Sequence, residues 1–218
     1  MSNLQRSAGI SAIFQALIYI AAFVYFGAFW AYPAEGTASD KMAYLAENQL
    51  VFSSVYFLMY GVFGVLLAIL VVGLYEKLKV TDSSMVKVGS LFGAVWVVLV
   101  IASGMLAHIG LSHAIDLMSV STEKAFDMWT VIVVIIDSLG GGNEFVGGLW
   151  VLLISLAALT AKMFTRGLNY LGVIVGLAGI ATIYPEDSLT EIFGITQIVW
   201  FIWLGVSLLT QADNESAV

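Results

Sequence analysis

The chain of 218 residues contains no cysteine, and this absence removes several classes of protein at once. Without thiols it cannot form disulfides, thiolate metal sites, thioether haem links or a cysteine nucleophile. Only 11% of its residues are charged, against about 25% in ordinary soluble domains. The 8 basic and 15 acidic residues give a net charge of −7, which argues against nucleic-acid binding because such binding requires basic surfaces.

The shortage of charge is matched by long apolar runs. Hydrophobic residues make up 61% of the chain, and its mean hydropathy is +0.99. Uncharged blocks of about 20 residues are typical of transmembrane helices. The N-terminal block lacks a signal-peptide cleavage pattern, so we interpret it as the first span. We therefore predict an all-α fold in the lipid bilayer, with one domain over residues 1–218 and six spans at about 9–30, 50–74, 88–107, 141–161, 168–184 and 192–210.

Three connecting segments are harder to interpret. Residues 40–47 have the pattern of a short amphipathic helix, and a polar loop is predicted from Ser112 to Lys124. The segment 125–138 contains an apolar run at 129–136, which is too short to cross a hydrocarbon core that needs about 20 residues. It could be a re-entrant helix, an interfacial helix, or an extension of the fourth span that bends at 140–142.

The basic residues predict how the chain is oriented. If the N-terminus is cytoplasmic, the cytoplasmic loops hold six basic residues and the outer loops hold Lys41 and Lys124, while most acidic residues fall outside. This asymmetry follows the positive-inside rule and places both termini in the cytoplasm. The six residues on the cytoplasmic side are Arg6, Lys77, Lys79, Lys87, Lys162 and Arg166.

The interiors of the predicted spans also lack features that active transport requires. No span carries an acidic or basic residue at its centre, so a proton relay, a charge-coupled pump and a retinal Schiff base lack their usual groups. No span has a central proline, and no pair of broken helices suggests an ion transporter. The spans offer no continuous polar lining for passive permeation, and no serine and histidine pair suggests intramembrane proteolysis.

In the stretch from Asp137 to Trp150, polar residues and glycines interrupt sequence that is otherwise apolar enough for a membrane span. Asn143 could cap the fourth span, with Glu144 in its first turn, where the helix dipole favours an anion by about 0.3–1 kcal/mol. Alternatively, Glu144 is a buried carboxylate that faces a polar cavity. A carboxylate at bilayer depth costs about 2.5–3.5 kcal/mol and is read as functional by default. The neighbouring glycines favour bending and close packing.

A few other polar residues lie within the spans. One interpretation is packing, in which these residues link neighbouring helices through interhelical hydrogen bonds, which contribute only about 0.6 kcal/mol each on average. The alternative is a mostly apolar pocket with a few convergent polar groups, which suits a lipophilic small molecule. The predicted ligand-binding residues are Glu144, Asn143, Gln15, Gln197, Trp150 and Trp200, and nothing in the sequence predicts a particular cofactor.

The two histidines suggest a different function. His108 and His113 are about 140° apart on a helix, so they are not an i, i+4 ligand pair, but His113 and Asp116 share a face if the helix continues. A metal site or outer-face enzyme could therefore use His108, His113, Asp116, Asp137 and Glu144. Simple hydrogen-bonded interfacial histidines are the structural alternative.

Short motifs spread over the chain suggest a family. They are Arg6-Ser7-Ala8-Gly9-Ile10, Ala46-Glu47-Asn48, Gly73-Leu74-Tyr75-Glu76-Lys77-Leu78-Lys79, Gly148-Leu149-Trp150 and Gly167-Leu168-Asn169-Tyr170-Leu171-Gly172. In their order and spacing they resemble the bacterial membrane proteins called domain of unknown function 4386, although Asn169 stands where a proline is expected. The resemblance implies six helices in a bacterial inner (cytoplasmic) membrane and no particular activity. A partner subunit or a homo-oligomer is a further hypothesis.

Overall fold

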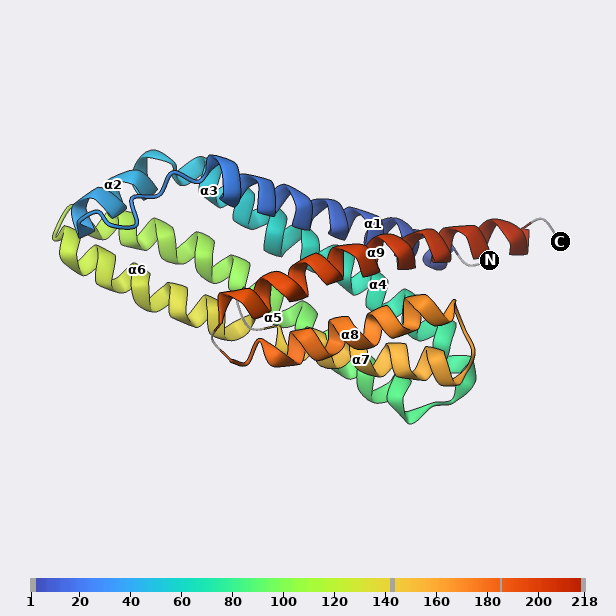
Figure 1. Ribbon diagram of the computed structural model, residues 1–218. Helices are drawn as coiled ribbons and strands as arrows, with labels where there is room; N and C mark the ends of the chain where they lie inside the picture. Colours follow the sequence, from blue (N-terminus) through green and yellow to red (C-terminus); the bar gives the residue numbers. More distant parts are fainter. Residues whose placement is uncertain (1–2, 142–143, 185, 217–218) are drawn as a thin grey trace.

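The computed structural model describes residues 3–141, 144–184 and 186–216, and every regular element in that part is a helix (Figure 1). In chain order these are α1 (Asn3–Val24) with the π-turn η1 (Tyr25–Phe29), α2 (Ala38–Glu47), the rod of α3 (Gln49–Tyr56), η2 (Phe57–Val62) and α4 (Phe63–Leu78), the 3-10 turn η3 (Lys79–Thr81), α5 (Ser84–Leu117), α6 (Thr122–Ile136), η4 (Asp137–Gly141), α7 (Phe145–Thr160), α8 (Arg166–Ala181) and α9 (Asp187–Ser216).

Five helical stretches are long and apolar enough to cross a membrane by length and composition: Asn3–Phe29, Gln49–Thr81, Ser84–Leu117, Thr122–Thr160 and Ser188–Thr210. The fourth joins α6 and α7, and α8 is a shorter apolar helix. Large apolar side chains such as Phe14, Val98 and Ile174 are 52%, 65% and 55% exposed, as expected for surfaces that meet lipid. The all-helical fold and the apolar helices indicate a multi-pass membrane protein; six crossings remain a prediction.

Helix α5 has 34 residues and a length of about 51 Å, and other helices pack along both of its halves. Helix α6 packs beside its later half, where Gly110 meets Ile132, and α7 packs beside its earlier half, where Gly93 meets Trp150. Between them, Gly140 has a φ of +135°, which breaks the helical path. The helical path that contains residues 125–138 therefore bends at Gly140, as the alternative of an extended fourth span predicts, and the place of this segment in the membrane remains a prediction.

The predicted polar loop from Ser112 is wrong over its first part, because α5 continues to Leu117. The cause is a small second core at this end, in which buried residues of α5 pack with α2, α3 and α6: Met42, Leu45, Phe52, Leu111, Ala114, Ala125 and Trp129. The amphipathic helix predicted at 40–47 is confirmed as α2. It begins at a capping box between Thr37 and Asp40, whose hydrogen bonds hold the pKa of the Asp40 carboxyl below its usual value.

The opposite end, which we call the terminal end, holds Asn3, the last residues of α9 and the α4–α5 and α7–α8 turns (Figure 1). Glycines allow helices to approach closely here and along the bundle. A Cβ added to Gly148 of α7 would lie 2.6 Å from the backbone nitrogen of Ile180 and 2.7 Å from the carbonyl oxygen of Gly176. The packing role inferred for Gly148 from the sequence agrees with this contact.

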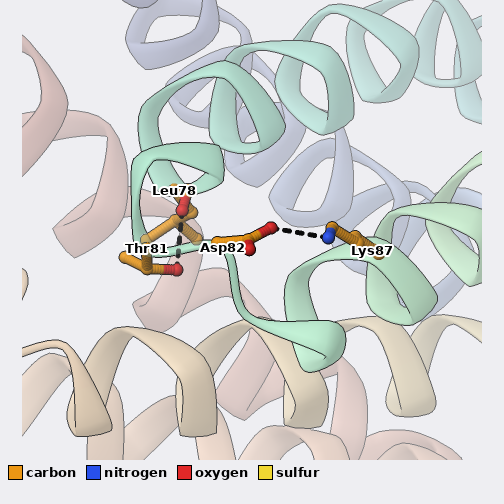
Figure 2. A network of polar contacts seen from close by, with 4 residues as sticks. All are labelled: Leu78, Thr81, Asp82 and Lys87. Atoms are coloured by element: carbon orange, nitrogen blue, oxygen red, sulfur yellow. Dashed lines mark hydrogen bonds and ion pairs between the residues drawn. The ribbon is translucent and has the colours of Figure 1, made fainter.

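The turn between α4 and α5 shows how polar groups are satisfied at the terminal end (Figure 2). The Thr81 hydroxyl donates a hydrogen bond to the carbonyl of Leu78 at 2.8 Å, and the Lys87 ammonium contacts Asp82 at 2.6 Å. Asp82 adopts a left-handed conformation with a φ of 46° and reverses the chain. Asp is one of the few residues besides glycine that tolerate this conformation.

Candidate functional site

Glu144 lies where α6 and α7 meet, and its backbone is fixed by the end of α8. Its N–H donates a hydrogen bond to the Thr182 hydroxyl at 2.8 Å, and that hydroxyl donates to the carbonyl of Gly179 at 2.7 Å. Glu144 is itself the residue before α7 and makes no side-chain capping bond. The prediction that it sits inside the first turn is therefore wrong. Asn143, predicted as a cap and as a ligand contact, lies outside the described residues.

Beside Glu144 lies an internal cavity of about 120 Å³. It is mostly apolar, and its walls come from α1, η2, α4, α5, η4 and α9; they include Tyr19, Phe23, Tyr60, Phe63, Val100 and Phe193. A single water needs only about 10–15 Å³ measured in this way, so the space suits several waters or a small organic group. Phe23 is 41% exposed, which places one wall of the cavity at the surface of the bundle.

Next to the cavity, six aromatic rings from α1, α4, α5, α7 and α9 form a closed circuit through the core. Successive ring centroids are 5.4 to 6.3 Å apart, a normal range for aromatic pairs. The members are Tyr19, Phe63, Trp96, Trp150, Trp200 and Phe201. Trp150 and Trp200, predicted as ligand contacts, are thus buried in this circuit and do not line the cavity itself.

The bundle centre contains polar atoms that have no hydrogen-bond partner among the described residues. They include both amide atoms of Gln15 and of Gln197, the indole nitrogens of Trp96 and Trp150, and Oε2 of Glu144. A buried polar group without a partner costs about 1–3 kcal/mol, so native proteins keep few of them. The two glutamines are fully buried but form no interhelical hydrogen bonds in the described structure, contrary to the packing interpretation.

Glu144 itself is half-buried as a residue, whereas its Oε2 atom is inaccessible to water. The indole nitrogen of Trp96 is likewise buried without a hydrogen-bond partner among the described residues. Glu144 therefore lines the cavity with one oxygen of its carboxylate buried and unpartnered.

The predicted metal ligands are not brought together. His108, His113 and Asp116 all lie on α5, Asp137 lies on η4, and all four are exposed. Within the described parts of the chain, no group of three or more His, Cys, Asp or Glu residues is placed to hold a metal ion. His108 instead lines a separate apolar groove of about 490 Å³ between the α3–η2 segment and α5.

The depth of the cavity follows from the helix lengths. Tyr19 lies 13 residues after Arg6 on α1, and Val100 lies 13 residues after Lys87 on α5. At a rise of about 1.5 Å per residue, the cavity is about 20 Å from the basic terminal end. The sequence alone could not show this depth, because it does not reveal that α6 packs along the later half of α5 and that α7 packs along the earlier half.

Several residues of the site were missed or undervalued. Phe63, Phe193 and Thr182 carry no signal in the sequence, because an apolar ring or a threonine near a helix end is common in any span. Tyr19 stood out only through its i, i+4 spacing from Gln15. Comparison of the chain with protein-family models, with curated proteins and with solved structures finds no match.

Proposed function

We propose that this protein is a six-span membrane protein that binds a small ligand in the internal cavity beside Glu144. In this proposal α8 is the fifth span, both termini are cytoplasmic, and the membrane is a bacterial inner membrane of the kind the family resemblance implies. Support for the orientation comes from the basic residues at the terminal end. The proposed depth puts the cavity inside a hydrocarbon core about 30 Å thick.

The observation that carries the proposal is a cavity with mostly apolar walls that is lined by Glu144, whose Oε2 atom is buried without a partner among the described residues. A fold has no stability to gain from burying a carboxylate without a partner. A ligand that binds beside Glu144 supplies the missing partner, and the apolar walls supply most of the contact area. No specific observation favours a metal site or an enzyme at the outer face, since no group of three or more His, Cys, Asp or Glu residues is placed to hold a metal ion in the described parts of the chain.

Filling the cavity tests the proposal. Val100 lines the cavity and is 3% exposed, whereas Val98 on the same helix is 65% exposed. Native mass spectrometry of the protein purified in a mild detergent should find a retained small molecule in the wild type and in Val98→Phe. The molecule should be missing from Val100→Phe because the larger ring occupies its place.

The absence of any retained or added small molecule from the wild type would count against the proposal. So would equal retention by the two phenylalanine variants, because the ligand would then lie elsewhere. Elution of both variants as monodisperse species on size-exclusion chromatography is the control for folding.

A further inference from the structure

The chemistry of the cavity wall also indicates what kind of ligand it takes, and this step rests on the proposed function. The residues with polar side chains on the wall are Glu144, Tyr19, Tyr60 and Thr190. No lysine, arginine, histidine or amide side chain lines it. Such a wall contains a potential negative charge and hydroxyl groups, and it has no cationic donor for an anion.

The Glu144 carboxylate has no cation of the protein beside it. Two ion pairs of the described residues, Lys79 with Glu76 and Lys87 with Asp82, lie at the terminal end and not beside Glu144. The remaining basic residues lie at helix ends or in connecting segments. A carboxylate that is removed from water without a counter-charge is costly, and a bound cation removes that cost.

The aromatic side chains complete the site for a cation. Phe23, Tyr60 and Phe193 reach the cavity from three different elements, together with Tyr19 and Phe63. Tyr19 and Phe63, which both line the cavity, meet edge to face, with centroids 5.4 Å apart and planes at 78°. Ring faces attract ammonium groups, and aromatic cages are a known means of recognising alkylated ammonium.

We propose that the cavity binds the ammonium head of an organic cation, with Glu144 as its counter-ion. The volume of about 120 Å³ accommodates a head group of a few heavy atoms. An apolar remainder of the ligand can extend past Phe23, whose exposed ring lies at the bundle surface. The ammonium could belong to a free lipophilic amine or to the choline head group of a lipid.

The test compares two probes of the same shape by isothermal titration calorimetry in maltoside detergent. One is benzyltrimethylammonium, and the other is its neutral isostere, neopentylbenzene. The wild type should bind the cation at least about 30-fold more tightly, because a buried charge without its partner loses that much or more. Glu144→Gln should abolish this preference, while Asp137→Asn, an exposed carboxylate outside the cavity lining, should preserve it.

Phe23→Leu provides a second test in case Glu144→Gln does not fold, because Phe23 lies at the surface and its replacement should not disturb the core. It should weaken binding of the cation about 2- to 5-fold and leave the neutral probe unchanged. Competition by added phosphatidylcholine would assign the site to a lipid head group, and its absence would assign it to a free amine. Equal binding of both probes by the wild type would overturn the cation proposal but keep a ligand cavity. Failure of both probes, with no molecule retained by the purified protein, would overturn the proposed function as well.

Discussion

The turn between α4 and α5 gives its polar side chains partners, whereas the centre of the bundle leaves several of its polar atoms without them. In the turn, Thr81 bonds to Leu78 and Asp82 pairs with Lys87, all within ten residues of chain and close to solvent. At the centre, Gln15, Gln197 and Glu144 come from three distant parts of the sequence and contain unpartnered buried atoms. Polar groups in the turn have partners that stabilise the fold, whereas the unpartnered polar atoms at the centre have none among the described residues.

This contrast predicts that stability depends mainly on apolar packing between helices, and little on the exposed ion pair of the turn or on the polar centre. The variants that test it are best compared by the midpoint of thermal unfolding in one detergent. Their expected effects run from a large loss of stability to none.

The largest effect is expected where two helices touch through backbone atoms. In Gly148→Leu the new side chain has no room, because the backbone of α8 lies within 3 Å of an added Cβ. We expect a loss of about 3 kcal/mol or more and a failure to purify as a monodisperse species. Gly27→Leu is the matched control, since no atom lies within 4 Å of an added Cβ there. Normal behaviour of Gly148→Leu would show that α7 and α8 do not pack in this way.

A small effect is expected in the turn. Asp82→Asn keeps the size of the side chain and its tolerance of a left-handed conformation, and it removes the charge that pairs with Lys87. Exposed pairs contribute little, so the unfolding midpoint should hardly change at neutral pH. A large fall in the unfolding midpoint would contradict this expectation and show that the pair stabilises the turn.

The same pair has a defined pH dependence. The Lys87 ammonium holds the pKa of the Asp82 carboxyl below its ordinary value. The contribution of the pair is therefore fully present above the ordinary pKa of an aspartate and is lost as the pH falls through the lowered pKa. Any difference between the wild type and Asp82→Asn should accordingly disappear in strong acid.

Much of the helical layout could be predicted from the sequence, because uncharged apolar runs can satisfy their backbone only as helices in a membrane. The extension of α5 to Leu117 could not be predicted, since His113 and Asp116 resemble a loop until α2 and α6 are known to cover Leu111 and Ala114.

Of the ligand contacts predicted from the sequence, Glu144 lines the cavity, whereas Gln15 and Gln197 are buried and do not line it. All three were singled out because polar residues in spans are few, and all three have unpartnered buried atoms. The cavity itself depends on the rotation and relative depth of several helices, which no local pattern encodes. Tyr60 and Phe193 line the cavity only because the fold brings η2 and α9 to the same place as Glu144.

The double variant Gln15→Leu with Gln197→Leu tests the central claim most directly, because it replaces two fully buried amides with apolar groups of similar size. If their unpartnered atoms contribute nothing to the fold, the unfolding midpoint of the ligand-free protein should stay the same or rise, and the ligand should be retained because neither amide lines the cavity. If they are structural, the midpoint should drop by more than about 3 °C, the shift expected for a loss of about 1 kcal/mol in a protein of this size. That drop would contradict the account.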